Sequence, residues 1–318
     1  MMAAPAATGG ALTTPAPIAL FAFNRPVHLA RTAASLAANH LAAASDLWVF
    51  CDGPRHAEDE ADVREVRKVA TGITGFASVS VVERQVNAGL AASVMAGVTR
   101  LCESSGRAIV VEDDLVLSPH FLQFINEGLD RFADEERAMQ VTGYMFPGSP
   151  AGLPESFFTR LPSSWGWGTW RRAWQKMDPD AASLQRQIRK RGLARSMDLD
   201  CASGYLEMLR YQVAGRLDSW AIRWYASMLL GGGLALRPAR SLVSNAGMDG
   251  SGVHCDATGV FDVDVAKEPV RVFPDAVEEC AVGVEAIRAF YLSRCESLAR
   301  RALRRLRRGV SALGRQSA

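Results

Sequence analysis

Residues 108–117 read AIVVEDDLVL, with a β-branched apolar centre at residues 109–111. Such a run predicts a strand that is buried on both faces. Three carboxylates follow it directly, those of Glu112, Asp113 and Asp114. Crowded acidic side chains repel one another and disfavour a strand, so a cation or a hydrogen-bonded polar ligand is their natural neutraliser. The stretch indicates a ligand site at the end of a buried strand; the alternative is an acidic strand end in a solvated turn.

Three apolar runs precede this one, and each is followed by a helical pattern. The predicted strands are residues 18–23, 47–51 and 77–82, and the predicted helices are residues 27–41, 58–70 and 90–102. A further helix is predicted at residues 120–132 and a further strand at residues 139–142. Such alternation predicts an α/β fold with a mostly parallel sheet flanked by helices, whose ligands bind beyond the carboxyl ends of the strands.

The composition excludes several classes of protein. The chain has 318 residues, of which 48% are hydrophobic and 22% are charged, enough to bury a full core. A net charge of +2 gives no sign of a nucleic-acid-binding protein. The six cysteines form no CxxC pair, which argues against a zinc knuckle or a disulfide-stapled secreted module and favours the cytoplasm. No apolar run is long enough to span a membrane.

Polar residues or glycines follow each predicted strand. They are Asn24, Arg25, Asp52, Gly53, Arg84, Asn87, Gly89 and the three carboxylates at 112–114. Together they would suit a nucleotide, with Asp52 on a base or ribose, Arg84 on phosphate and the acidic cluster around a divalent cation. No GxGxxG follows the first strand and no GxxxxGK[ST] occurs, so neither a dinucleotide fingerprint nor a P-loop is present.

After residue 142 the alternation stops. Residues 163–174, SSWGWGTWRRAW, hold four of the seven tryptophans, and the glycines between them favour a wall on which a sugar ring can stack. The alternative is a hydrophobic loop packed under a domain. Residues 180–215 are predicted to be helical, and Asp218 is expected to cap the next helix at a domain edge that faces the cleft. Short strands are expected at residues 234–236 and 241–243.

The two ends of the chain differ from its centre. Residues 1–16 contain prolines and lack a basic region, which predicts a disordered leader rather than a signal peptide. Residues 284–313 place apolar side chains, among them Ile287 and Tyr291, at helical spacing beside an arginine-rich run. A basic amphipathic helix suits the anionic inner face of a membrane, and a partner-binding or solvated helix is the alternative.

These motifs resemble a family. The EDD triplet, Asp52-Gly53 and Asn87-Ala88-Gly89-Leu90 look like the GT-A fold of nucleotide-sugar glycosyltransferases, and EDDLVLSPHFL at residues 112–122 is similar to the metal-binding motif of N-acetylglucosaminyltransferase I. SSWGWGTW, DSWAIRWYAS and DGSGVHC resemble bacterial family 2-like glycosyltransferases found among cell-surface polysaccharide genes. The resemblance covers about residues 17–256.

The resemblance implies roles for single residues. Asp114 would coordinate Mn²⁺ or Mg²⁺ with Asp113 beside it, Asp113 would also contact the ribose or donor sugar, and Glu112 would stay near them. Asp52 would hold uracil or ribose. Asn24, Arg25, Arg84, Asn87 and Gly89 would line the nucleotide pocket, and Trp165, Trp167, Trp170 and Trp220 the sugar site. His254 would add a metal or phosphate contact, and Asp218 would be the general base, with Asp178, Asp180 and Asp249 as other candidates.

The expected protein is a metal-dependent, inverting glycosyltransferase of the cytoplasm or the inner membrane face that uses a UDP-linked or other nucleotide sugar. Its acceptor would be a glycan, a lipid-linked glycan or a protein. Residues 17–145 would bind the donor, residues 146–280 of the same domain the acceptor, and residues 281–318 would form the basic helix. A nucleotidyltransferase and a non-catalytic carbohydrate-binding protein are the alternatives.

Overall fold

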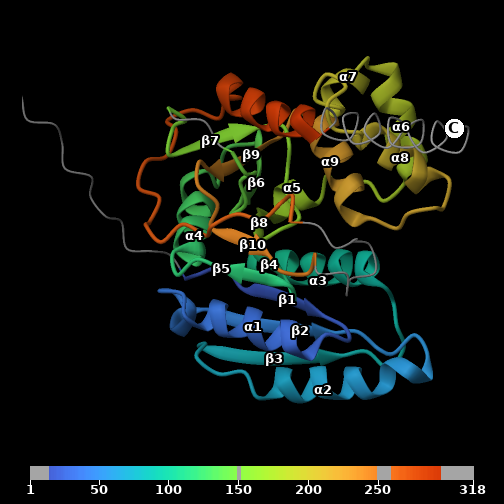
Figure 1. The fold of residues 1–318 in the computed structure, drawn as a ribbon, viewed down its shortest axis with the longest axis vertical. Coiled ribbons are helices and arrows are strands. Elements are labelled where there is room, and N and C mark those ends of the chain that lie inside the picture. The colour runs from blue at the N-terminus through green and yellow to red at the C-terminus, as the bar shows by residue number, and fades with distance from the viewer. Residues whose placement is uncertain (1–13, 149–151, 249–258, 295–318) are drawn as a thin grey trace, which may run out of the picture.

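The computed structural model describes residues 14–148, 152–248 and 259–294, which share one central sheet. Its strand order is β3-β2-β1-β4-β8-β6-β9-β7. Strands β8 and β7 are antiparallel to their neighbours, and every other pairing in this sheet is parallel. Figure 1 shows helices along both sides of the strands. The predicted α/β fold with a mostly parallel sheet is confirmed.

The first half follows the predicted alternation closely. Its elements are β1 (Ile18–Ala22), α1 (Pro26–Ala37), β2 (Asp46–Cys51), α2 (Glu60–Thr71), β3 (Ser78–Glu83), α3 (Leu90–Ser105) and β4 (Arg107–Glu112). Pro26 opens α1, where its missing N–H and fixed φ angle cost nothing. Since β1 pairs in parallel with both β2 and β4, the polar residues after these three strands meet at one edge.

The acidic stretch separates two sheets. Strand β4 ends at Glu112, a turn holds Asp113 and Asp114, and the chain resumes as β5 (Leu115–Leu117). Strand β5 leaves the central sheet and pairs antiparallel with β10 (Val243–Asn245). The two aspartates therefore lie where the central sheet gives way to this small second sheet.

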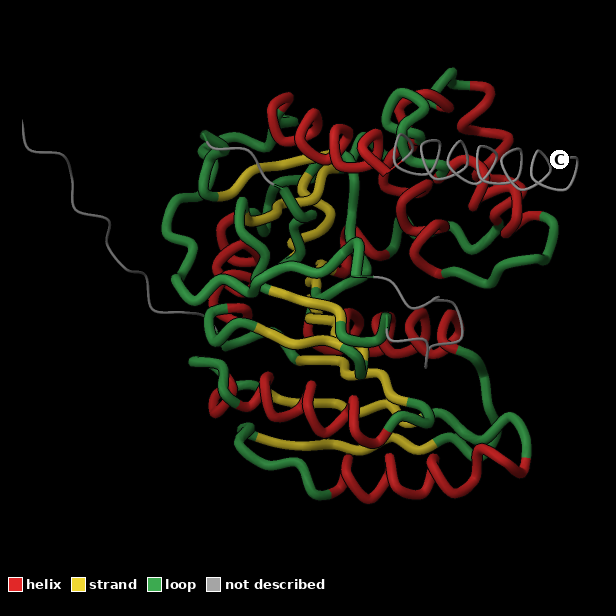
Figure 2. The backbone as a smooth tube through the Cα atoms, in the orientation of Figure 1, coloured by secondary structure: helices red, strands yellow, loops and turns green. Residues whose placement is uncertain are grey.

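The second half completes the sheet from less regular segments. Its strands are β6 (Ala138–Thr142), β7 (Ser156–Thr159), β8 (Trp167–Trp170) and β9 (Leu234–Pro238), and its helices are α4 (Phe121–Arg131), α5 (Arg171–Trp174), α6 (Ala181–Lys190), α7 (Ala194–Met197), α8 (Tyr205–Val213) and α9 (Trp220–Leu230). In Figure 2 the strands continue through both halves, while the helices of residues 181–230 gather at the upper right.

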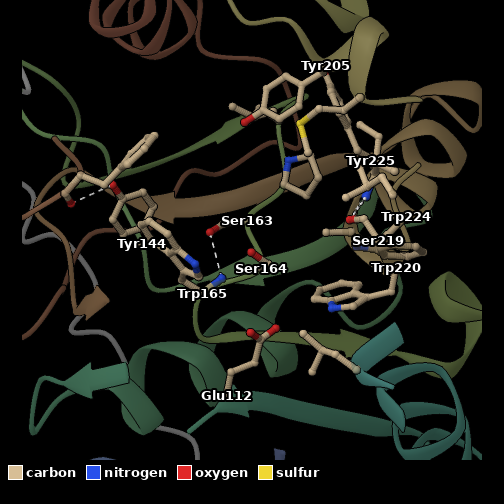
Figure 3. Close-up of a pocket in the computed structure, with 18 of the residues that line it drawn as sticks. Glu112, Tyr144, Ser163, Ser164, Trp165, Tyr205, Ser219, Trp220, Trp224 and Tyr225 are labelled. Carbon is tan, nitrogen blue, oxygen red and sulfur yellow. Dashed lines mark hydrogen bonds between the residues drawn. The ribbon is translucent and has the colours of Figure 1, made fainter. Parts of the chain in front are cut away.

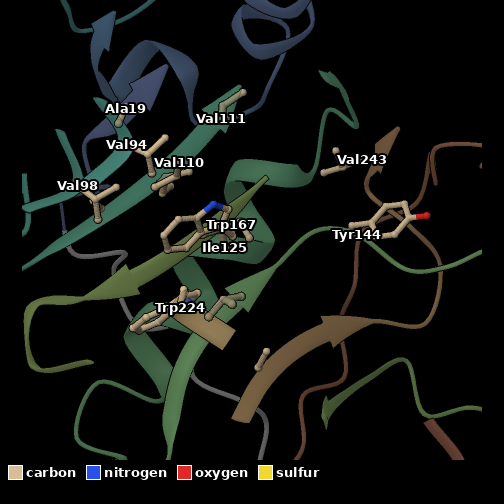
Figure 4. Close-up of a cluster of buried hydrophobic side chains, with 14 of the residues drawn as sticks. Ala19, Val94, Val98, Val110, Val111, Ile125, Tyr144, Trp167, Trp224 and Val243 are labelled. Carbon is tan, nitrogen blue, oxygen red and sulfur yellow. The ribbon is translucent and has the colours of Figure 1, made fainter. Parts of the chain in front are cut away.

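Three of the four tryptophans of the tryptophan-rich segment, Trp167, Trp170 and Trp174, form part of the core, which corrects the expected stacking wall at these positions. Trp167 and Trp170 lie on β8, in the middle of the sheet, and are 0% and 5% exposed. In Figure 4 Trp167 lies close to Val110 and Ile125. A Cβ at Gly168 would stand 2.7 Å from Ile125 Cγ2, so this glycine allows the close packing of β8 on α4. The glycines that favoured an exposed loop here serve burial instead.

The described start of the C-terminal segment belongs to the fold. Residues 281–294 are helical, Ile287 is 1% exposed, and the rings of Phe290 and Tyr291 contact Phe146. Apolar side chains that were expected to face a membrane or a partner are thus packed on the protein. The basic run that follows lies outside the described residues, so its membrane contact stays a prediction. Across the described ranges, no helix has the length and apolar character needed to cross a bilayer.

Candidate active site

A cavity of about 370 Å³ opens beyond the carboxyl ends of β1, β2 and β4. We call it the carboxylate cavity. Its polar lining consists of Asn24, Arg25, Asp52, Arg55, Asn87, Ser93, Glu112, Asp113, Asp114 and Asp218, and Gly89 and Gly247 also border it. Most of the residues expected from the strand ends therefore meet in one place. Their convergence follows from the parallel pairing of the strands that carry them.

The two aspartates are bridged by the partly buried guanidinium of Arg25. Arg25 Nη2 donates to Asp113 Oδ1 at 2.5 Å and to Asp114 Oδ2 at 3.0 Å. Burial raises the pKa of Asp113 to about 6, while Arg25 opposes that rise. Although burial disfavours the charged guanidinium, the carboxylates of Asp113 and Asp114 raise the pKa of Arg25 above its ordinary value. Arg25 is thus the counter-ion of the acidic turn, a role that its position after β1 alone did not reveal.

Asp114 is held by residues 245–247, for which the sequence predicted no role. Its backbone carbonyl accepts a hydrogen bond from Ala246 N at 2.7 Å, and Asn245 Nδ2 donates to its Oδ1 at 3.3 Å. A Cβ on Gly247 would stand 2.2 Å from Asp114 Oδ2, so only glycine fits here without displacing the carboxylate. The sequence signal was Asn245-Ala246-Gly247 shortly after the strand predicted at residues 241–243, but the contact with Asp114 depends on the β5–β10 pairing.

Gly247→Ala should displace the Asp114 carboxylate, since the new methyl group occupies its space. On the expectation that this is a metal-dependent nucleotide site, Mn²⁺-dependent nucleotide binding, measured by calorimetry, should weaken about tenfold or more, which corresponds to about 1.4 kcal/mol. Gly72→Ala at the end of α2, where a Cβ meets no atom closer than 3.5 Å, should bind like the wild type. Unchanged binding in a folded Gly247→Ala protein would show that the position of Asp114 does not matter.

Glu112 lies at the junction of this cavity with a second one. Burial, together with the charges of Asp114 and Asp113, raises the pKa of Glu112 to about 8. Arg25 and a hydrogen bond from Trp220 oppose this rise. Glu112 is thus a carboxyl group that both cavities share. It is more than the polar end of a buried strand.

Asp52 organises the start of α3. Its carboxylate accepts hydrogen bonds from the backbone N–H groups of Gly53, Ala88 and Gly89 at 2.9–3.0 Å. An acidic group at this position also favours the helix electrostatically, because the first N–H groups of a helix lack partners. Asn87 Nδ2 donates to Gly53 O at 2.9 Å and closes the same loop. Backbone groups therefore already bond to both carboxylate oxygens of Asp52. The contact of Asp52 with a base or ribose stays a prediction.

Two other expected nucleotide residues have different surroundings. Asn24 Nδ2 donates to Asp59 Oδ1 at 2.9 Å, and the hydrogen bond from Arg55 lowers the pKa of Asp59. Arg84 does not border the carboxylate cavity, which corrects its predicted place in the nucleotide pocket. Arg84 directly follows β3 at the sheet edge, whereas Asn87 and Gly89, later in the same loop, reach the cavity.

Asp218 precedes α9 and borders both cavities. Ser219, not Asp218, caps this helix, since Ser219 Oγ accepts from Ile222 N. The Asp218 side chain is 67% exposed and accepts a hydrogen bond from the buried Arg223 Nη2 at 2.8 Å. Released from capping, Asp218 keeps its second oxygen available to a ligand. The expected cleft-facing position is confirmed, and the expected cap is wrong.

The other candidate bases and the histidine lie elsewhere. Asp180 caps α6 by accepting from Ala182 N and Ser183 N, and Asp178 accepts from Asp180 N. Neither borders the two cavities. Asp249 and His254 lie outside the described residues, so their expected roles stay predictions.

The second cavity, of about 380 Å³, is mainly aromatic, and we call it the aromatic cavity. In Figure 3 Tyr144 and Trp165 lie on one side of it, Trp220 and Trp224 on the other, and Glu112 at its lower end. Trp165 and Trp220 thus border a cavity as the sequence predicted, whereas Trp167 and Trp170 do not. Leu90, Glu112 and Asp218 line both cavities, which makes the two cavities neighbours.

The donor set decides whether a divalent cation fits. Among residues 14–148, 152–248 and 259–294, no group of three His, Cys, Asp or Glu side chains is arranged to hold a metal ion. Mg²⁺ and chemically similar cations are often held by one or two carboxylates, with phosphate oxygens and waters as further ligands. Asp113 and Asp114 supply two such carboxylates. The described residues fit a cation that arrives with a phosphate-bearing ligand, not one in a closed protein cage.

Comparison with known proteins gives weak structural similarities. A mannosyltransferase from Pyrobaculum calidifontis, PcManGT, in complex with GDP-Man and Mn²⁺, shares 10% identity over 69% of this chain and 70% of its own, with a TM-score of 0.40. Glucosyl-3-phosphoglycerate synthase from Mycobacterium tuberculosis, in complex with Mn²⁺, UDP and glucosyl-3-phosphoglycerate, shares 17% identity over 64% of this chain and 81% of its own, with a TM-score of 0.37. No protein-family model and no curated protein sequence matches the chain. Similarities with TM-scores this low do not assign a function to the chain.

Proposed function

We propose that this protein is a metal-dependent GT-A glycosyltransferase that transfers a sugar from a nucleotide sugar, UDP-linked in our expectation, with inversion at the sugar carbon. The observation that carries the proposal is the pair of neighbouring cavities. One is polar and centred on Asp113 and Asp114, the other is aromatic, and Asp218 stands between them. Donor and acceptor can thus meet beside a carboxylate that the protein holds in place through Arg223.

The carboxylate cavity would bind the donor. Asp114 and Asp113 would hold Mn²⁺ or Mg²⁺, and such a cation stabilises the negative charge on a leaving nucleoside diphosphate. Arg25 lies beside the same carboxylates, so its guanidinium can pair with phosphate oxygens once a cation neutralises the aspartates. The Asp52 loop and Asn87 would shape the nucleoside side of the cavity.

Asp218 would act as the general base. Its free oxygen would take the proton of the acceptor hydroxyl while that hydroxyl attacks the sugar carbon and the bond to the diphosphate breaks. The buried Arg223 fixes the carboxylate at the cleft, which favours a defined geometry of attack. One such displacement inverts the anomeric configuration.

The test is a panel of UDP- and GDP-sugars incubated with the purified protein and Mn²⁺. We expect slow release of nucleoside diphosphate from one donor, loss of release with EDTA, and inversion of the released sugar in an NMR time course. Asn24-Arg25-Pro26 lacks the glycine-rich signature of a nucleotidyltransferase, so pyrophosphate should not form from a nucleoside triphosphate and a sugar phosphate. Pyrophosphate release, or sugar binding that neither nucleotide nor metal affects, would contradict the proposal.

A further inference from the structure

The described lining of the aromatic cavity contains no lysine, arginine or histidine. Its charged members are Glu112 and Asp218, both acidic, and its uncharged polar members include Ser163, Ser164 and Ser219. The remaining lining is aliphatic or aromatic. A phosphate or carboxylate that entered this cavity would lose its water and find carboxylates rather than a cation.

Two buried guanidinium groups lie close to the cavity without lining it, and both are occupied: Arg223 donates to the cavity-lining Asp218, and Arg237 is bonded to other protein groups. Arg237 is 0% exposed and does not border the cavity. It donates to Thr159 Oγ1 at 3.0 Å, to Leu161 O and to Tyr144 O at 3.5 Å. Its hydrogen bonds therefore tie together the segments behind the aromatic wall, and the guanidinium itself cannot reach a ligand in the cavity.

The tryptophans that line the aromatic cavity pack against other aromatic side chains. Trp220 stacks on Trp167 with ring centroids 5.1 Å apart, and Trp165 makes edge contacts with Tyr144 at 4.5 Å and Phe261 at 5.7 Å. These contacts hold the indoles of Trp165 and Trp220 in place before any ligand arrives. Preformed apolar surfaces of this kind lower the entropic cost of binding.

The tyrosine hydroxyls also face protein partners. Tyr205 and Tyr291 are hydrogen bonded to each other at 2.6 Å, and Tyr144 and Tyr225 donate to the backbone carbonyls of Phe261 and Met197. The polar groups left for a ligand are mainly the serines and the two carboxylates. The cavity thus combines an apolar aromatic wall with a few neutral hydroxyls and an acidic end.

We infer that the aromatic cavity takes a neutral sugar residue as the acceptor and rejects anionic sugars. The inference rests on the proposed function and adds the acceptor's chemical class. A pyranose has an apolar face that suits the indole of Trp165 or Trp220, and a hydroxyl rim that suits the serines. The same placement presents one hydroxyl to Asp218 at the junction with the carboxylate cavity.

The experiment compares methyl hexopyranosides with the matching methyl uronosides, which differ by one carboxylate. Binding to the full chain is measured by saturation-transfer NMR and tryptophan fluorescence. We expect the neutral glycoside of at least one hexose to bind and its uronoside to bind about tenfold more weakly or worse, since like charges in a desolvated site cost free energy. Trp165→Ala should weaken neutral binding about tenfold, whereas Trp48→Ala, on β2 outside the cavity, should not.

Ser164→Lys supplies a variant that does not remove a wall residue. The added cation should improve uronoside binding relative to the neutral glycoside, and melting curves establish that each variant is folded. Uronosides that bind as well as neutral glycosides, or a cavity that binds a short prenol but no glycoside, would overturn the inference. Hydrolysis of the nucleotide sugar is measured separately. If neutral glycosides bind but no nucleotide sugar is hydrolysed, the proposed function alone is contradicted. If a nucleotide sugar is hydrolysed but no glycoside binds, this inference alone is contradicted.

Discussion

Asp114→Asn should reduce sugar transfer about 10³-fold, because it removes one of the two carboxylates available to a cation while keeping the shape of the side chain. Charge stabilisation by a bound cation contributes several kcal/mol to a transition state, and each 1.36 kcal/mol is a factor of ten in rate. The measurement is the rate of nucleoside diphosphate release at saturating donor and Mn²⁺. Calorimetry should show a parallel loss of the Mn²⁺ dependence of UDP binding.

Asp62→Asn is the matched control, since it removes an exposed carboxylate in the first turn of α2, away from both cavities. This variant should transfer sugar at the wild-type rate. Full sugar transfer and full Mn²⁺-dependent UDP binding by the Asp114→Asn protein would contradict the proposed metal site.

The central site was predictable because it depends on strand direction. Once hydrophobic periodicity identifies the strands of a parallel sheet, the residues after them fall at one edge, which brought Arg25, Asp52 and the acidic turn together. Periodicity does not give the order of the strands. Arg84 follows an equally clear strand at the sheet edge but lies outside the cavity, while Asn87, three residues further along the same loop, borders it.

The missed features depend on contacts between distant segments. Asn245 bonds to Asp114, and Gly247 leaves room for its carboxylate, because β10 pairs with β5. Neither strand carries a sequence signal for its partner. Similarly, Gly168 reads as a loop residue until α4 is placed against β8. Local composition predicts local conformation, whereas the use of a glycine for turning or for close packing is decided by its neighbours in space.

Without a bound metal ion, the acidic turn relies on Arg25 as its counter-ion. Three carboxylates in sequence would repel one another, and the bridging guanidinium offsets part of that repulsion for Asp113 and Asp114. A divalent cation would take over this role and leave Arg25 to a phosphate. The same constellation can therefore be stable in the free protein and reactive in the donor complex.

Asp218→Asn should lower the turnover number of transfer by about 10² to 10⁴, the range expected when a general base is removed. The amide can still accept the hydrogen bond from Arg223, so the start of α9 and the binding of UDP with Mn²⁺ should be preserved. Steady-state kinetics with saturating acceptor measure the effect, and calorimetry measures nucleotide binding on the same preparation.

Glu207→Gln is the control for this variant, because Glu207 is an exposed acid on α8 that borders neither cavity. Its turnover number should match that of the wild type. A loss of turnover in Asp218→Asn with unchanged UDP binding assigns the defect to the chemical step, whereas equal losses in both would mean that Asp218 serves donor binding. If Asp218→Asn transfers sugar at the wild-type rate, the base lies elsewhere, and Glu112→Gln becomes the decisive variant, since Glu112 is the other carboxylate common to the two cavities.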